Sequence, residues 1–254
     1  FENERTVLAS ELAQFENYLQ EHPEDEEAKA ALKRLVEQLQ QNPLLDTRPL
    51  YIEQEQLLQA WTRQTLFCGG NRAGKTFSGL LNDLIELLPR ELLPESLAYY
   101  KHLDPPVRGR IVSPGRSTTQ EVVIFETLRN LVPKAGLLGG SWEKAFSKQD
   151  NILFFQGGSW LQFLTAEMDV DKHSGAALEF VHFDEEPTGD RGLQIFRENM
   201  MRLVSTDGRF WMTMTPTGGF DWSMEQLYDN SHLDHVTVIR ADMDKNPTLS
   251  EQAK

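Results

Sequence analysis

The stretch GGNRAGKT at residues 69–76 decides the fold. It satisfies the pattern Gly-x4-Gly-Lys-Ser/Thr of a phosphate-binding loop, in which glycines let successive backbone N–H groups point at phosphate oxygens. We expect Lys75 to reach the terminal phosphates of ATP and the Thr76 hydroxyl to coordinate Mg²⁺. An apolar segment precedes the loop and an amphipathic one follows it, as a strand–loop–helix unit requires. The predicted nucleotide site comprises the whole loop: Gly69, Gly70, Asn71, Arg72, Ala73, Gly74, Lys75 and Thr76.

A second acidic motif, LEFVHFDEEP, follows at residues 178–187. An apolar strand here would leave Asp184 at its carboxyl end, where ligands bind in open α/β sheets. We therefore expect Asp184 to hold the magnesium ion and Glu185 to polarise the water that attacks the terminal phosphate. This adjacent acid is typical of hydrolases, since P-loop kinases use a substrate hydroxyl instead. Glu186 is interpreted as a solvated or capping residue, and His182 as a packed core histidine.

The segments around these two motifs alternate between strand and helix patterns. This alternation predicts an α/β fold with a mostly parallel, doubly wound sheet and a β-hairpin insertion at residues 152–164. The expected strands are 65–68, 110–113, 180–183, 210–214 and 235–239, and the expected helices are 53–63, 75–88, 120–131 and 191–204.

Residues 1–45 have apolar positions at helical spacing on both sides of an acidic turn, which predicts a helical hairpin. The hairpin is interpreted either as a packing appendage or as a lid or partner-docking element. Residues 43–49 are expected to be a linker, and residues 46–250 an ATPase domain.

Composition limits the possible partners. The formal net charge is −14 at pH 7, from 25 Lys and Arg against 39 Asp and Glu. A protein that binds nucleic acid over its whole surface would carry the opposite sign, so any contact with DNA is expected to be local. The single cysteine, Cys68, leaves no internal disulfide. The six histidines lack metal-ligand spacing, which argues against zinc, and no apolar run is long enough to span a membrane.

Several motifs occur in the order found in one protein family. They are GGNRAGKT at 69–76, NILFFQGGSWLQFLTAE at 151–167, FDEEP at 183–187, TMTPTGG at 213–219 and DKNPTLSE at 244–251. Together they cover about residues 50–250, and in this order they resemble the ATPase domain of the large terminase subunit of tailed bacteriophages. That protein is the motor that pumps DNA into a procapsid.

The resemblance implies a P-loop NTPase of the additional-strand, catalytic-glutamate type. Its implied activity is ATP hydrolysis that powers translocation of double-stranded viral DNA, with ATP and Mg²⁺ as cofactors. The implied partners are double-stranded DNA, the portal protein, the small terminase subunit and further copies in a ring on the procapsid. The isolated domain is expected to be mostly monomeric and to reside in the host cell cytoplasm, without a membrane. The nuclease domain of large terminases is expected to be absent, because few residues follow DKNPTLSE.

The resemblance also assigns residues of the nucleotide site. YIEQEQLLQAW at 51–61 aligns with the family's adenine-contacting segment, which makes Gln54 the candidate that reads adenine, with Gln56 a close competitor. Arg72 would sense the terminal phosphate or stabilise transition-state charge; alternatively, it bonds to the acidic strand and shapes the loop. An arginine finger supplied by a neighbouring copy is a further alternative, with three unranked candidates: Arg191, Arg197 and Arg202.

The TMTPTGG motif implies a coupling element made of Thr213, Thr215 and Pro216. A hydroxyl of Thr213 or Thr215 is expected within hydrogen-bond reach of Glu185 or its water, where it would report phosphate release. β-propensity alone is the alternative explanation of the two threonines.

Two other functions remain open for the same core. One is a nucleotide-gated regulatory switch, against which Glu185 argues because it supplies a hydrolytic acid. The other is a helicase-type remodelling ATPase, which needs a second P-loop-like domain or an arginine-bearing partner. Stimulation of ATP turnover by DNA distinguishes a motor from a switch.

Overall fold

The fold is built on one eight-stranded sheet. The computed structural model describes residues 3–216, 221–242, 244 and 246. The strand order is β3-β4-β5-β2-β6-β7-β1-β8. Neighbours from β5 to β8 pair parallel, whereas β3, β4 and β5 pair antiparallel. The strand bounds are β1 Gln64–Gly69, β2 Arg108–Ser113, β3 Phe146–Ser147, β4 Ile152–Phe154, β5 Trp160–Thr165, β6 Phe180–Asp184, β7 Arg209–Met214 and β8 Val236–Ala241.

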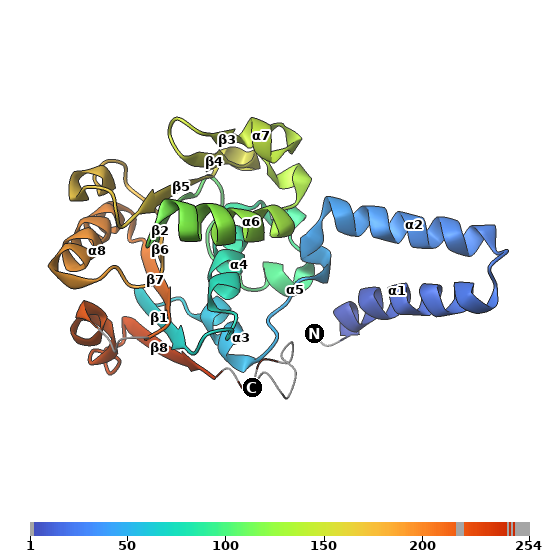
Figure 1. Ribbon diagram of the computed structural model, residues 1–254, viewed down its shortest axis with the longest axis horizontal. Coiled ribbons are helices and arrows are strands. Elements are labelled where there is room, and N and C mark those ends of the chain that lie inside the picture. Colours follow the sequence, from blue (N-terminus) through green and yellow to red (C-terminus); the bar gives the residue numbers. More distant parts are fainter. Residues whose placement is uncertain (1–2, 217–220, 243, 245, 247–254) are drawn as a thin grey trace.

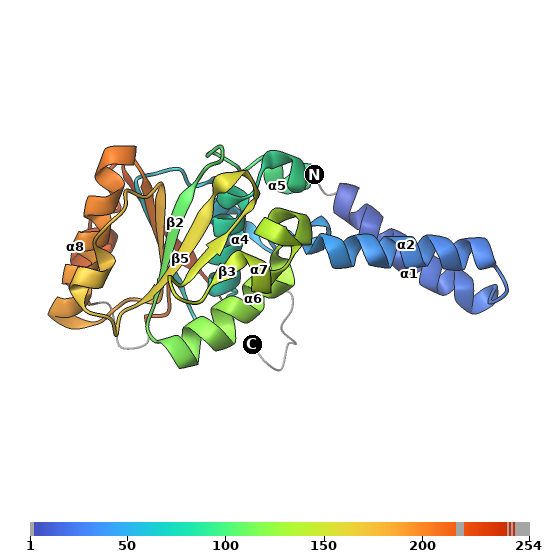
Figure 2. The same ribbon diagram turned by 90° about the horizontal axis from the view of Figure 1, so that it is seen from above.

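Helices cover both faces of the sheet. Helix α8 lies on one face, and α4 and α6 lie on the other, as Figure 2 shows in the view from above. This arrangement confirms the predicted mixed α/β fold with a mostly parallel sheet. The helix bounds are α1 Asn3–Glu21, α2 Glu26–Gln41, α3 Ile52–Gln59, α4 Lys75–Leu87, α5 Glu95–Ala98, α6 Phe125–Leu131, α7 Trp142–Ala145 and α8 Gly189–Leu203.

Strand β6 separates two hydrophobic cores. Phe180 packs into the core beneath α4 and α6, whereas Val181 and Phe183 pack into the core beneath α8. Successive side chains of a strand point to opposite faces, so a strand covered on both sides is apolar throughout. Burial on both faces explains why the sequence before Asp184 is a nearly continuous apolar run. The alternation of side chains places His182 on the same face of the sheet as Phe180.

The predicted linker at 43–49 is wrong in its first half. Residues Pro43–Asp46 form a short 3-10 turn, and Leu44 is completely buried in the core beneath α4 and α6. Asn42 caps this turn by accepting from the N–H of Leu44. The predicted helix at 120–131 also differs, because its first part is a wider π-helical segment, Arg116–Ile124, that continues into α6.

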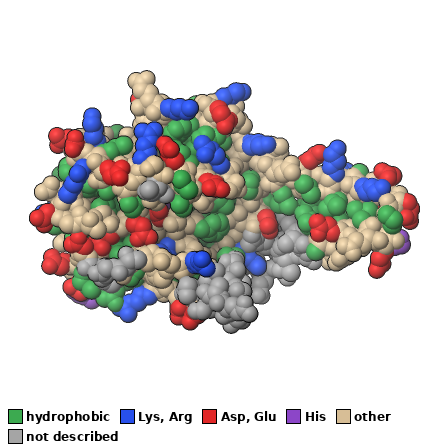
Figure 3. Space-filling view, viewed as in Figure 1, with side chains coloured by type: hydrophobic (Ala, Val, Ile, Leu, Met, Phe, Trp, Pro, Cys, Tyr) green, Lys and Arg blue, Asp and Glu red, His purple; other side chains and the backbone are tan. Residues whose placement is uncertain are grey.

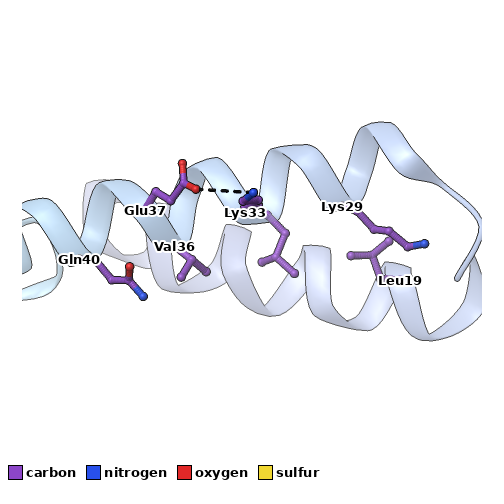
Figure 4. Close-up of a pocket in the computed structure, with 7 residues that line it drawn as sticks. Leu19, Lys29, Lys33, Val36, Glu37 and Gln40 are labelled. Atoms are coloured by element: carbon purple, nitrogen blue, oxygen red, sulfur yellow. Dashed lines mark ion pairs between the residues drawn. The ribbon is translucent and has the colours of Figure 1, made fainter.

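The N-terminal helices form the predicted hairpin, which extends away from the sheet as an arm (Figure 1). Asp25 begins α2 by accepting from the N–H groups of Glu27 and Ala28, each across 3.0 Å. Hydrophobic side chains are visible along the arm in Figure 3. A groove between the two helices is lined by Leu19, Leu32 and Val36, with Lys29, Lys33, Glu37 and Gln40 also lining it (Figure 4). The lid or docking role of the hairpin stays a prediction. Within the described part of the chain, no helix is both long and apolar enough to cross a membrane.

Candidate nucleotide site

The loop at residues 69–76 connects β1 to α4, as predicted. Its turn into the helix occurs at Gly74, whose φ of +66° is in the left-handed region. A Cβ atom at Gly74 would lie 2.5 Å from Nε2 of Gln54. Glycine therefore suits the backbone angle here, and a larger residue would also force the Gln54 side chain to shift.

Lys75 and Thr76 occupy the first turn of α4. Lys75 is only 6% exposed, and its ammonium donates to the backbone oxygen of Gly70 across 2.7 Å. Burial lowers the pKa of Lys75, while Glu185 and Asp184 oppose that shift. The Thr76 hydroxyl donates to Oδ1 of Asp184 across 2.8 Å. Thr76 therefore reaches the acidic strand, whereas Lys75 folds back onto the loop.

The two predicted acids follow one another at the end of β6. Asp184 is 2% exposed and accepts from the hydroxyls of Thr76 and Thr213, across 2.8 and 2.9 Å. Glu185 has a φ of +77°, which is uncommon for a residue other than glycine. Burial raises the pKa of Glu185, and the neighbouring Asp184 charge adds to this increase. A carboxylate with a raised pKa is a better proton acceptor, as a catalytic base requires.

Each candidate threonine bonds to a different acid. Strand β7 lies next to β6, with Asp184 opposite Thr213 in the register. The Thr213 hydroxyl bonds to Asp184, whereas the Thr215 hydroxyl donates to Oε1 of Glu185 across 3.1 Å. The expected contact between a threonine hydroxyl and Glu185 is thus made by Thr215. Pro216 follows directly, and the rest of the TMTPTGG motif lies outside the described residues.

Gln54 lies against the loop, while Gln56 is exposed. Gln54 is 2% exposed, and its Oε1 accepts from the backbone N–H of Leu50 across 2.7 Å. Its Nε2 has no hydrogen-bond partner among the described residues. Bidentate recognition of adenine needs both amide atoms, so Gln54 would have to exchange its bond to Leu50 for one to the base.

Arg72 is exposed and has a φ of +65°. Its guanidinium forms no ion pair with Asp184 or Glu185 in the described structure. Its backbone oxygen accepts from Nδ2 of Asn246 across 2.6 Å. Asn246 belongs to the DKNPTLSE motif, which otherwise lies mostly outside the described residues. The segment after β8 therefore contacts the nucleotide loop directly.

The candidate arginine fingers all lie on α8. Arg191 donates to the backbone oxygens of Glu167 and Met168. Arg202 donates to the backbone oxygen of Gly175 and forms an ion pair with Glu198. Arg197 is exposed.

Magnesium fits the donors at the head of α4. In the described part of the chain, no cluster of three or more His, Cys, Asp or Glu side chains could hold a metal by itself. Mg²⁺, however, is usually held by one or two protein oxygens together with substrate phosphates. The Thr76 hydroxyl and the Asp184 carboxylate, 2.8 Å apart, supply such oxygens. Glu186 is not part of this pair, because it accepts from the backbone N–H groups of Asp221 and Ser223.

The structure also adds residues that sequence reasoning did not assign to the site. His182 bonds through Nε2 to the Thr213 hydroxyl and through Nδ1 to Asp83 on α4, across 2.9 and 2.8 Å. Trp211 donates to the other oxygen of Asp83 across 3.1 Å. The available signal was an aspartate inside the apolar stripe of a helix and a histidine inside an apolar strand.

The strand–loop–helix unit and the sheet around it define a P-loop NTPase fold. No protein-family model and no curated protein matches the sequence. Solved structures of phage large terminases share the fold. The large terminase of a thermophilic bacteriophage matches with a TM-score of 0.58 and 14% identity, over 81% of this chain and 49% of that one. Its complex with ADP matches with a TM-score of 0.54 and 15% identity, over 81% and 48%.

The large-terminase ATPase domain of Thermus phage P74-26 matches with a TM-score of 0.53 and 16% identity, over 79% of this chain and 82% of that one. The chain thus has the fold of large-terminase ATPase domains. It spans about half the length of the large terminase of the thermophilic bacteriophage.

Proposed function

We propose that this chain is the ATPase motor domain of a DNA-packaging large terminase. The observation that carries the proposal is the group of side chains at the N-terminal end of α4 and the C-terminal ends of β6 and β7. Thr76 bonds to Asp184, and the adjacent Glu185 is a half-buried carboxylate bonded to Thr215. A hydroxyl and a carboxylate for the metal, followed at once by a second carboxylate for water, suit nucleoside triphosphate hydrolysis.

Each residue has a role that its position supports. The N–H groups of residues 69–76 and the Lys75 ammonium would bind the phosphates, with Lys75 exchanging its bond to Gly70 for one to a phosphate oxygen. Thr76 and Asp184 would hold Mg²⁺, which when bound neutralises phosphate charge. Glu185 would accept a proton from the attacking water while a water oxygen–phosphorus bond forms and the bond to the ADP oxygen breaks.

The strand order supports the additional-strand type of P-loop enzyme. Strand β7 lies between the loop strand β1 and the acidic strand β6. It is this intervening strand that brings Thr213 and Thr215 to the acids. A coupling role for Thr213, Thr215 and Pro216 is part of the proposal.

DNA translocation rests on the fold shared with large terminases and on the order of the motifs. Double-stranded DNA, the portal protein, the small terminase subunit and a ring of copies on the procapsid are the proposed partners. One large terminase of the same fold was crystallised with ADP, which supports a nucleotide ligand here. With a net charge of −14, the chain would contact DNA through a local surface. A trans-acting arginine from α8 and adenine recognition by Gln54 belong to the same proposal.

ATP binding and hydrolysis by three variants test the assignment. Lys75→Ala removes a phosphate contact and is expected to weaken both ATP binding and turnover. Glu185→Gln is expected to bind ATP normally and to lose about 10²- to 10⁴-fold in turnover, the usual contribution of a catalytic base. Glu186→Gln is the matched control, because among the described residues Glu186 bonds to backbone N–H groups and not to the Thr76, Asp184 or Thr215 side chains. Equal turnover in Glu185→Gln and wild type would contradict the catalytic assignment. Turnover that does not rise with double-stranded DNA would favour a regulatory switch.

A further inference from the structure

Three elements bring a row of polar side chains together behind the nucleotide site. On α4, residues Thr76, Gly79 and Asp83 are spaced by three and four positions, so they share one helix face. On β6, His182 and Asp184 point to the same side of the sheet, as do Trp211 and Thr213 on β7. We call the resulting connected side chains the polar chain: Trp211, Asp83, His182, Thr213 and Asp184.

The polar chain is buried along its whole length. Asp83, His182 and Thr213 are 0% exposed, and Asp184 and Trp211 are 2% and 3% exposed. Burying such groups is costly unless their hydrogen bonds are satisfied. Here both oxygens of Asp83 and both ring nitrogens of His182 have partners. The polar chain ends at Asp184, where it meets the proposed magnesium site.

Counting protons fixes the direction of the central bonds. A threonine hydroxyl has one proton, and Thr213 donates it to Oδ1 of Asp184. Nε2 of His182, 2.9 Å from the same hydroxyl oxygen, must therefore carry a proton and donate it. Asp83 faces the other ring nitrogen and keeps the imidazole in this orientation, while Trp211 donates to the second Asp83 oxygen. Hydrogen-bond donation therefore runs from His182 to Thr213 and from Thr213 to Asp184.

Helix α4 leaves the imidazole little room to turn. A Cβ atom at Gly79 would lie 2.5 and 2.6 Å from Cε1 and Nε2 of His182, and 2.9 Å from Cγ2 of Thr213. The ring and the threonine methyl thus pack directly on the helix backbone one turn after Thr76. The absent side chain at Gly79 is what allows β6 and β7 to approach the helix this closely.

We propose that His182 and Asp83 are positioning residues that fix the Thr213 hydroxyl on Asp184, and so orient the carboxylate that holds magnesium in the proposed function. The inference rests on that function for its effect on catalysis, but the hydrogen-bond directions stand independently of it. In this role the two residues act through Thr213 and never touch the nucleotide. They also tie α4, the helix after the phosphate loop, to β7, the strand that Thr215 follows.

Substitutions at His182 separate positioning from packing. His182→Leu fills the space without a donor, whereas His182→Gln can still present an N–H group to Thr213. We expect His182→Leu to lower turnover by about 10- to 100-fold, the range seen when groups that orient metal ligands are removed. The increase in nucleotide affinity that magnesium causes should be smaller by the same factor. His182→Gln should restore most of both. Nucleotide affinity without magnesium should match wild type in all variants, because neither His182 nor Asp83 hydrogen-bonds to the loop.

Asp83 offers a second pair of variants. Asp83→Asn keeps an oxygen for Trp211 and a group that can donate to Nδ1, which leaves Nε2 as the protonated nitrogen. It should stay close to wild type, whereas Asp83→Leu should lose the magnesium-dependent affinity. His173→Leu is the matched control, since His173 is also a histidine with 0% exposure but bonds to Asn199 instead of the site. Thermal unfolding of every variant shows how much each loss owes to folding.

A nitrogen-15 spectrum of the histidine side chains tests the hydrogen bonds without any nucleotide. We expect Nε2 of His182 to carry a slowly exchanging proton, whose resonance moves in Thr213→Val. An unprotonated Nε2 would overturn the proposal, as would equal turnover and magnesium response in His182→Leu and wild type, or equal losses in His182→Leu and His182→Gln. If wild type neither binds nor hydrolyses ATP, the proposed function fails instead, and the spectrum still decides the hydrogen-bond directions.

Discussion

Thr215 binds both carboxylate oxygens of Glu185. Its backbone N–H donates to Oε2 across 2.7 Å, and its hydroxyl donates to Oε1 across 3.1 Å. The proposed catalytic base is therefore held by the end of the strand that carries the coupling motif. A ligand shifts only those states that it contacts differently, so coupling requires this contact to change between the ATP and ADP states.

Thr215→Val deletes the hydroxyl while keeping the shape and the N–H bond to Glu185. We expect ATP affinity to be unchanged and hydrolysis to fall modestly, because the Thr215 hydroxyl in the described structure bonds to Glu185 and not to the phosphate-binding loop. DNA packaging by a motor that carries the variant should fall much further. The measurement is the length of DNA moved per ATP consumed, with Thr213→Val compared alongside. An unchanged ratio in both variants would remove the two hydroxyls as coupling elements.

Asp184→Asn should impair magnesium binding more than folding. An amide oxygen can still accept from Thr76 and Thr213, so the local hydrogen bonds survive. The lost negative charge weakens the attraction for Mg²⁺. Turnover should fall and recover in part when the magnesium concentration is raised. Full activity with wild-type magnesium dependence would place Asp184 outside the metal site.

Gly79→Ala should destabilise the protein even though alanine favours a helix. The helix gain is about 0.5–1 kcal/mol, whereas overpacking a buried site costs about 1–3 kcal/mol. The added methyl would collide with His182 and Thr213. We expect a lower melting temperature and reduced turnover. Adding His182→Ala should make room for the methyl. The double variant should therefore lose less stability than the sum of the losses in the two single variants. A higher melting temperature in Gly79→Ala would contradict the packing described here.

His173 should make stability fall as the solution becomes acidic. Burial, together with the nearby Arg110, lowers the pKa of His173 from 6.5 to about 4. Between these values the unfolded chain binds a proton that the folded chain does not, so the contribution of neutral His173 is full above 6.5 and is lost as the pH falls toward 4. His173→Gln cannot titrate. The free energy of unfolding, measured with urea, should therefore fall less steeply with decreasing pH in His173→Gln than in wild type. Parallel curves of this free energy against pH would contradict the assignment.

Local pattern was enough to predict the two motifs of the site. GGNRAGKT needs only its own backbone and the first turn of α4, so its strand–loop–helix form follows from neighbouring residues. Likewise, β6 is apolar because both of its faces are covered, and a polar residue after such a run marks the carboxyl end of a strand. The order of strands was not predictable in the same way, because register depends on packing between distant segments.

The tertiary structure decided which groups meet. Sequence spacing left Gln54 and Gln56 as competitors, and only the fold put Gln54 against Gly74. It also left open which threonine reaches Glu185, which the parallel register of β6 and β7 assigns to Thr215.

His182 was predicted to be a plain core histidine, yet it bonds to Asp83, 99 positions away in the chain. The sequence by itself determined the chemical groups of the loop and the acidic strand. Their partners were decided by the fold, because a buried polar group must bond to whatever the packing of the sheet and helices brings beside it.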